Sequence, residues 1–165
     1  GGILRRTIAP APNVPLELEK QARSFATRIM DALNYVGVLC LEMFQVGDHL
    51  LANEMATRVH NSGHWTMEGA LTSQFENHVR AVMGMPLGSC EARGASIMIN
   101  LIGEAPPQEK VLCLPGAKLH LYGKEPRPGR KLGHINLHGA DIAEVKDQLG
   151  RLAEAIGEPA ARYLS

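Results

Sequence analysis

Residues 36–56 read VGVLCLEMFQVGDHLLANEMA, and this stretch decides the fold that the sequence predicts. A nearly continuous apolar run ends at Val46, and the turn residues Gly47 and Asp48 follow it. A second run, also rich in apolar residues, then leads to Ala56. Two such runs joined by a glycine-containing turn predict an antiparallel β-hairpin.

Each arm of this hairpin carries one acid among apolar neighbours, Glu42 in the first arm and Glu54 in the second. A two-residue turn would place Glu42 opposite Asn53, whereas a three-residue loop would place it opposite Glu54. Facing carboxylates repel each other unless a divalent cation lies between them, and oxygen ligands suit Mg²⁺. The second register therefore predicts a magnesium site. In the alternative interpretation, each acid pairs with an arginine such as Arg58 or lies at the wet edge of the sheet.

Hydrophobic periodicity and breaker residues predict the remaining elements. Apolar residues three and four positions apart predict amphipathic helices over 16–35, 67–83 and 141–156, the second capped by Thr66 and ended by Gly84. Short apolar runs between turn residues predict strands over 3–9, 96–101, 110–114, 119–122 and 132–137. This content defines an α+β fold class. Helix gives way to short strands and loops near residues 86–94, so we expect two units, 1–94 and 95–165.

The loop after the hairpin is dense in polar groups. The guanidinium of Arg58 offers a rigid fork that suits phosphate or carboxylate groups. His60 and His64 are four residues apart, but the intervening Asn-Ser-Gly disfavours a helix, and the sequence supplies no tetrahedral ligand set for zinc. The same Asn-Ser-Gly triplet is also ordinary turn chemistry.

A second cluster of cations lies at residues 124–131, KEPRPGRK. Its proline and glycine residues stiffen the loop, which favours presentation of the cations at a fixed place. The alternative interpretation is a solvated basic loop.

Composition and charge exclude several classes of protein. Lys+Arg and Asp+Glu both number 17, which argues against a general binder of nucleic acid or of acidic membranes. The 3 cysteines are widely spaced and suggest no disulfide framework, so we expect a reducing, cytoplasmic location. No apolar run is long enough to span a bilayer. The chain opens Gly1-Gly2 without a methionine, which is compatible with an excised fragment or a trimmed tag.

Several stretches, in order along the chain, resemble N5-carboxyaminoimidazole ribonucleotide synthases, members of the ATP-grasp family. The matching runs are YVGV (35–38), RVHNSGHWT (58–66), TSQFENHVRA (72–81), GMPLG (84–88) and GRKLGHIN (129–136). Met43, Met55 and Thr57 depart from the residues usual in that family. Ala56 stands where many ATP-grasp enzymes carry an asparagine, so metal binding would rest on two carboxylates together with phosphates and water.

The resemblance implies the C-terminal half of an ATP-grasp domain, a mostly antiparallel sheet with helices on one face, followed by a small β-rich C-terminal segment. It implies ATP-dependent carboxylation of 5-aminoimidazole ribonucleotide with bicarbonate, through carboxyphosphate, in purine biosynthesis. The cofactors would be ATP and Mg²⁺, and the full-length enzyme would be a homodimer. Intact members also carry an N-terminal Rossmann-like domain and a lid over ATP, so we expect this chain alone to be inactive. The alternatives are another ATP-grasp carboxylase or ligase, or a non-catalytic binding domain on the same scaffold.

The resemblance also assigns roles to particular residues. Glu42 and Glu54 would hold Mg²⁺, with Asn53 and Glu54 close to the nucleotide phosphates. Arg58 would stabilise bicarbonate and carboxyphosphate, and His60, Asn61 and Ser62 would line the pocket where the carboxyl group meets the amine. Lys124, Arg130 and Lys131 would grip the 5′-phosphate of the ribonucleotide.

Overall fold

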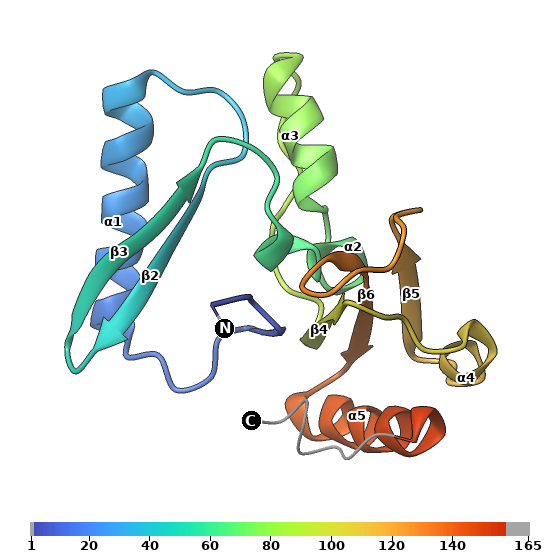
Figure 1. Cartoon of the computed structure of the whole chain (residues 1–165). Helices are drawn as coiled ribbons and strands as arrows, with labels where there is room; N and C mark the ends of the chain where they lie inside the picture. The colour runs from blue at the N-terminus through green and yellow to red at the C-terminus, as the bar shows by residue number, and fades with distance from the viewer. Residues whose placement is uncertain (1, 158–165) are drawn as a thin grey trace.

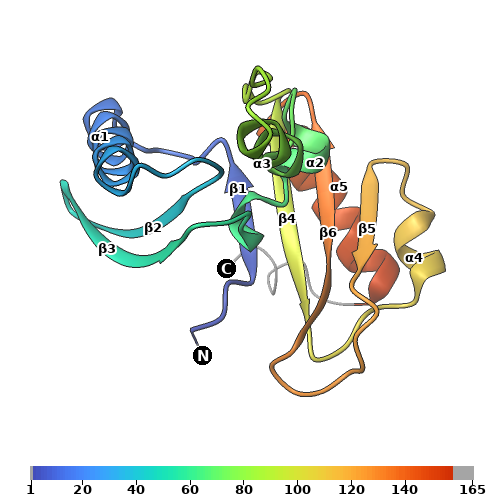
Figure 2. The same ribbon diagram turned by 90° about the horizontal axis from the view of Figure 1, so that it is seen from above.

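A four-stranded antiparallel sheet organises most of the chain in the computed structural model, which describes residues 2–157 (Figures 1 and 2). Its strands lie in the order β1 (Arg6–Ala9), β4 (Ala95–Ile102), β6 (Lys131–Gly139) and β5 (Ala117–Leu121). The N-terminal strand β1 pairs with β4, so residues far apart in the sequence share one sheet.

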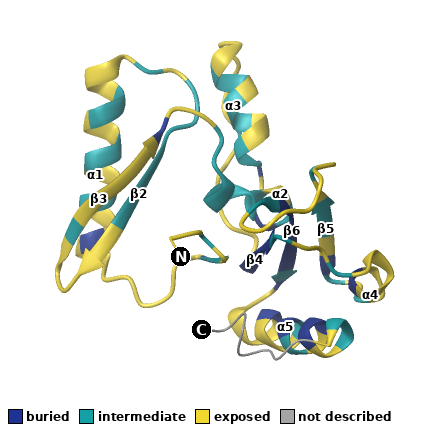
Figure 3. Ribbon diagram, viewed as in Figure 1, coloured by how far each residue is buried: buried dark blue, intermediate teal, exposed yellow. Residues whose placement is uncertain are grey.

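The two faces of this sheet differ because side chains alternate along a strand. One face is apolar and packs against α5 (Ile142–Ile156) and α4 (Gln108–Leu112). Figure 3 shows buried residues concentrated in this part of the molecule. Its core contains Ile97, Ile99, Ile135, Leu137, Val111, Val145, Leu149 and Leu152. The opposite face carries buried polar side chains, Ser96, Asn100, His134 and Asn136. The sheet therefore has one face that forms the core and one face suited to a site.

The hairpin is a separate two-stranded sheet, formed by β2 (Cys40–Val46) and β3 (His49–Ala56), beside α1 (Leu16–Leu33). A cavity of about 650 Å³ lies between α1 and the hairpin. Most side chains of the hairpin and of α1 are at least partly exposed, and Leu18 is the buried residue of α1. The predictions of the hairpin and of this helix are confirmed, and Asn34, in the left-handed conformation, ends the helix.

The helix predicted over 67–83 is wrong as a single element. The chain forms α2 (Thr66–Gly69) and α3 (Gln74–Val82), separated because Ala70 leaves the helix to bridge Ala92. Ser73 caps α3 by accepting a hydrogen bond from the backbone N–H of Glu76. Thr66 accepts a bond from the backbone N–H of Gln74 instead of capping a helix of its own.

Residues 110–114 were predicted as a strand, and this is also wrong, because helix α4 covers most of them. An apolar run of five residues is too short for its periodicity to separate strand from helix. Within the helix Val111 is fully buried against the core of the sheet. The other predicted strands and the final helix are confirmed with small changes of their ends. No helix within residues 2–157 is both long enough and apolar enough to cross a membrane.

Candidate functional site

The two hairpin acids face each other, although by a route that the sequence analysis did not predict. The turn has two residues, since Val46 pairs with His49, and this turn alone would set Glu42 opposite Asn53. A bulge between Glu42 and Met43 makes Asn53 an extra residue in β3 and brings Glu54 opposite Glu42. The predicted pairing is therefore present, but the three-residue loop expected to produce it is wrong.

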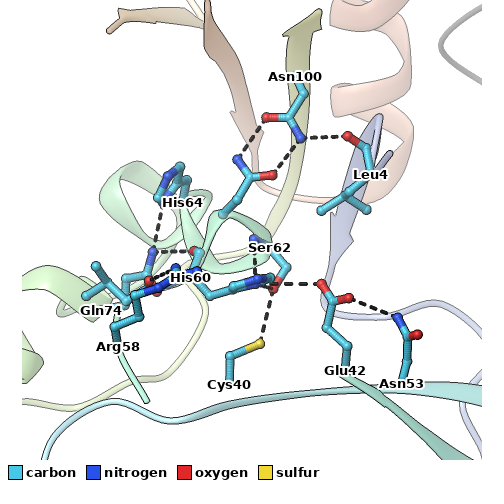
Figure 4. A network of polar contacts seen from close by, with 12 residues as sticks. Leu4, Cys40, Glu42, Asn53, Arg58, His60, Ser62, His64, Gln74 and Asn100 are labelled. Atoms are coloured by element: carbon cyan, nitrogen blue, oxygen red, sulfur yellow. Dashed lines mark hydrogen bonds and ion pairs between the residues drawn. The ribbon is translucent and has the colours of Figure 1, made fainter. Parts of the chain in front are cut away.

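Glu42 connects the hairpin to the loop that follows it (Figure 4). One carboxylate oxygen, Oε1, lies 3.6 Å from Nδ1 of His60, and the other accepts a hydrogen bond of 3.3 Å from the amide of Asn53. The side chains of Glu42 and His60 are 27% and 12% exposed, so this contact is largely shielded from water. The bulge thus places the side-chain amide of Asn53 beside the acid pair.

His60 is held by contacts on its ring and on its backbone. Its Nδ1 lies 2.9 Å from the hydroxyl of Ser62 and accepts from the backbone N–H of that residue. Gln74, from α3, accepts from the backbone N–H of His60 and donates to its backbone carbonyl, at 2.9 and 2.8 Å. The same amide nitrogen lies 2.9 Å from Nδ1 of His64. The loop therefore has a defined conformation around the imidazole of His60.

Arg58 follows the hairpin and lies close enough to Cys40 to act on its thiol, as the two acids do. Its guanidinium donates to the backbone carbonyl of Val59 at 3.0 Å, and in residues 2–157 it forms no ion pair with Glu42 or Glu54. The thiol of Cys40, at the start of β2, lies within the electrostatic influence of Glu42 and Glu54. Burial raises the pKa of the Cys40 thiol, the hydrogen bond with Ser62 opposes that effect, and both acids reinforce it. The interpretation in which Arg58 pairs with the acids is therefore not what the structure shows.

Asn61 links the loop to the polar face of the large sheet. Its side-chain oxygen accepts hydrogen bonds from Asn100 at 2.7 Å and from the ammonium of Lys131 at 2.9 Å, and its amide donates to Asn100 at 2.8 Å. Desolvation lowers the pKa of Lys131, while the negative charges of Glu42 and Glu54 oppose this shift. Lys131 of β6 and the hairpin acids therefore act on each other across the site.

Asn100 and Gln74 are the residues that the sequence analysis missed. Like Ser96, Asn100 stood as a polar residue at an alternate position of a largely apolar strand, and this was a usable signal. Gln74 carried no such signal, because its role depends on how α3 folds back onto the loop.

His120, Tyr122 and His134 lie close to one another and to the ring of His64. His120 stacks on His134 with ring centroids 4.5 Å apart, and the Tyr122 hydroxyl lies 2.7 Å from Nδ1 of His134. Burial lowers the pKa of His134 to about 3, with the other two histidines adding to the effect. Burial, followed by the charges of His60, His120 and Lys131, lowers the pKa of His64 to about 4. Both rings are therefore neutral at pH 7.

These histidines do not constitute a metal site. In the described part of the chain, no three His, Cys, Asp or Glu side chains converge to hold a metal ion. His120 instead pairs with Glu68 of α2 at 3.0 Å. The two facing carboxylates of the hairpin remain the candidate metal ligands.

The basic loop between β5 and β6 leads to this cluster. Lys124 is exposed, and its ammonium lies 5.3 Å from the centroid of the Tyr122 ring. The backbone N–H of Arg130 donates to the carbonyl of Arg127, and the backbone carbonyl of Arg130 accepts from the N–H of Gly103. Of the three cations predicted to bind a phosphate, Lys131 is the one whose side chain donates a hydrogen bond to Asn61, in the loop after the hairpin.

Two family models match the chain in consecutive segments. A model described as ATP-grasp domain matches residues 1–75, and a model described as phosphoribosylaminoimidazole carboxylase C-terminal domain matches residues 96–148. Together with the facing acids of the hairpin, these matches define the class of the chain as part of an ATP-grasp protein.

Relatives of known sequence and structure specify the family. N5-carboxyaminoimidazole ribonucleotide synthase of Vibrio parahaemolyticus is 52% identical over 140 residues, covering 85% of this chain and 37% of that protein. The crystal structure of the Thermus thermophilus synthetase matches with a TM-score of 0.90 and 59% identity, over 96% of this chain and 44% of that one. An Aspergillus clavatus synthase, in complex with ADP and 5-aminoimidazole ribonucleotide, matches with a TM-score of 0.85 and 36% identity, over 95% of this chain and 45% of that one.

The chain belongs to the N5-carboxyaminoimidazole ribonucleotide synthase family and corresponds to the C-terminal portion of its members. It spans less than half the length of these three relatives.

Proposed function

We propose that this chain supplies the carboxyl-transfer part of an enzyme that carboxylates 5-aminoimidazole ribonucleotide with bicarbonate and ATP. The observation that carries the proposal is the bulged hairpin, which sets Glu42 opposite Glu54 beside the His60 loop. In the proposed reaction, a bicarbonate oxygen attacks the γ-phosphorus of ATP, and ADP leaves. The resulting carboxyphosphate then passes its carboxyl group to the exocyclic amine, which loses a proton as inorganic phosphate departs.

The hairpin residues fit a magnesium ion. Glu42 and Glu54 present hard oxygen donors from adjacent strands, and Glu54 is exposed, so coordination positions remain for phosphate oxygens and water. Mg²⁺ bound there would neutralise charge on the β- and γ-phosphates during transfer. Asn53 lies beside this pair and would contact a phosphate oxygen through its carboxamide.

Groups of the loop that follows the hairpin would bind the small anions. Arg58 has a guanidinium free of the two acids, and we assign to it the charge of bicarbonate and carboxyphosphate. His60, Asn61 and Ser62 belong to the same loop, and we propose that they line the pocket that encloses the transferring carboxyl group. Preorganised donors of this kind stabilise developing negative charge without reorganisation at the moment of reaction.

The basic loop would bind the 5′-phosphate of the ribonucleotide through Lys124, Arg130 and Lys131. The hydrogen bond from Lys131 to Asn61 supports this arrangement, because it ties the end of the basic loop to the loop proposed to hold the carboxyl group. The substrate would then extend from the cations toward His60.

A chimaeric enzyme tests the proposal. This chain would replace the matched segment of the Vibrio parahaemolyticus synthase, and release of ADP would be measured with and without 5-aminoimidazole ribonucleotide. We expect ribonucleotide-dependent activity, and we expect Glu54→Gln to reduce it by about 100-fold with the fold retained.

Glu17→Gln is the matched control, because Glu17 is an exposed carboxylate on α1, remote from the site loop in sequence. It should leave the rate unchanged. A folded chimaera without ribonucleotide-dependent turnover, or one that Glu54→Gln leaves fully active, would refute the enzymatic role and favour a non-catalytic binding domain.

Three finer expectations accompany this proposal. The family resemblance predicts a homodimer for the full-length enzyme, which light scattering would measure. The wide spacing of the cysteines predicts a reducing, cytoplasmic location. The division into units 1–94 and 95–165 stays a prediction, and limited proteolysis near residues 86–94 would examine it.

A further inference from the structure

Asn100 is a buried polar residue on the site face of the large sheet, where the sequence offers no role for it. It lies in β4 and is 6% exposed. Its side-chain amide donates to the backbone carbonyl of Leu4 and to the oxygen of Asn61, at 2.8 and 2.7 Å, while its own oxygen accepts from Asn61. Both amide hydrogens of Asn100 are therefore used.

The orientation of the two carboxamides follows from Lys131. A lysine ammonium donates hydrogen bonds and cannot accept them, so the Asn61 atom that it contacts is the oxygen. The Asn100 atom facing that oxygen must then be the nitrogen, which also faces the carbonyl of Leu4. All three contacts agree on one arrangement.

In this arrangement the side-chain oxygen of Asn61 helps to hold the ammonium of Lys131. Its oxygen has two lone pairs, and these are taken by Asn100 and by Lys131. Without Asn100 the carboxamide of Asn61 would lose two of the hydrogen bonds that set its orientation, and its oxygen would be held less firmly toward the lysine. The position of the ammonium thus depends on a residue of the neighbouring strand β4, through Asn61.

We propose that Asn100 is a positioning residue, which fixes the carboxamide of Asn61 and through it the ammonium of Lys131 for the anionic substrates. The anion-binding part of this statement rests on the proposed function. The positioning part concerns the unliganded chain and is measurable without any substrate.

Nuclear magnetic resonance of the chain labelled with ¹⁵N-lysine provides the test. A lysine ammonium held by a hydrogen bond exchanges its protons slowly enough to give a cross-peak at low temperature. We expect the unsubstituted chain to give such a cross-peak from Lys131. It is assigned by its absence from the spectrum of Lys131→Met. In Asn100→Leu, which retains the side-chain volume but removes the hydrogen bonds, exchange of this signal should accelerate by about tenfold or more.

Asn77→Ala is the control, since Asn77 makes a comparable reciprocal pair of bonds with the backbone of Gly88, outside the site. It should leave the Lys131 signal unchanged. If Asn100→Leu does not fold, Asn100→Ala, which removes the same hydrogen bonds without a bulky apolar side chain, provides the test. Asn61→Ala removes the acceptor of Lys131 directly and shows how far exchange accelerates when that bond is lost.

Two outcomes would overturn the proposal: a Lys131 signal unaffected by the Asn100 or Asn61 variant, or no protected Lys131 signal in the unsubstituted chain. Because no ligand enters this measurement, its failure would leave the carboxylation proposal standing. Failure of the chimaera assay would equally leave the positioning result intact.

Discussion

Gln74 holds the backbone of His60 in the way that a neighbouring strand would. It accepts from the N–H of His60 and donates to its carbonyl, from a position 14 residues later in the chain. Together with Asn100, it makes the conformation of the loop depend on two uncharged amide side chains. The groups proposed to carry the chemistry were visible in the sequence as Glu42, Glu54 and Arg58. Of the groups that support them, Asn100 stood out as a polar residue in a largely apolar strand, whereas Gln74 carried no signal, because an amide acquires this role only through tertiary contacts.

Gln74→Ala should therefore destabilise the fold. The substitution leaves the N–H and carbonyl of His60 without their partners in a half-buried loop, which costs about 1–3 kcal/mol in the free energy of unfolding. Urea denaturation would measure it. Gln45→Ala removes an exposed glutamine whose side chain donates to the backbone carbonyl of Gly47 in its own turn, and it should stay within about 0.5 kcal/mol of the unsubstituted chain. Equal effects of the two substitutions would contradict the role given to Gln74.

At the scale of elements, the hairpin shows which features of a strand pair a sequence pattern predicts and which it does not. Two apolar runs around Gly47-Asp48 were enough to predict the strands and the turn. They did not reveal the bulge at Asn53, because an extra residue in one strand leaves the composition of both strands unchanged. The break between α2 and α3 was hidden for a similar reason. Apolar spacing continued through Ala70, which instead bridges Ala92.

The cap of α3 gives a prediction at this scale. Ser73 accepts a hydrogen bond from the N–H of Glu76 and so satisfies a backbone donor at the start of a short helix. Ser73→Ala should lower the free energy of unfolding by about 1 kcal/mol. Ser24→Ala, at an exposed position inside α1, should have little effect or a slightly stabilising one, because alanine favours helix. If both substitutions behave alike in thermal melts, the cap does not contribute.

At the scale of the whole molecule, the hydrophobic core and the proposed metal ligands lie in different parts. The core is formed by the large sheet with α4 and α5, whereas Glu42 and Glu54 belong to a hairpin whose residues are mostly exposed (Figure 3). Stability of the chain therefore depends on the large sheet, and binding of nucleotide phosphates would depend on the hairpin.

We expect this chain to bind Mg-ATP only weakly, with a dissociation constant above about 1 mM, an affinity of roughly 4 kcal/mol. In residues 2–157 we identify groups for the metal and the phosphates, Glu42, Glu54 and Asn53, but none for the base. Isothermal titration calorimetry would measure the affinity, with Glu54→Gln as the comparison. Micromolar binding that Glu54→Gln abolishes would show that these residues form a complete nucleotide site.

Acid should destabilise the fold through its buried histidines. His134 is 2% exposed, and burial lowers its pKa to about 3, whereas a histidine in the unfolded chain has its ordinary value of 6.5. Above pH 6.5 both states are neutral at this residue, so its contribution does not vary with pH. As the pH falls from about 6.5 toward about 3, the unfolded chain binds a proton that the folded chain does not. This residue should then lower the free energy of unfolding by at most about 1.4 kcal/mol per pH unit.

Urea denaturation at a series of pH values would measure this slope. His134→Phe retains an aromatic ring against His120 and removes the titrating group, so its stability should fall less steeply between about pH 6.5 and about pH 4. Loss of the contact with Tyr122 will lower its stability at every pH, which leaves the slope as the informative quantity. His49→Asn, at an exposed position of the hairpin turn, should keep the slope of the unsubstituted chain. Parallel pH profiles for His134→Phe and the unsubstituted chain would show that His134 is not the buried neutral group whose protonation opposes folding.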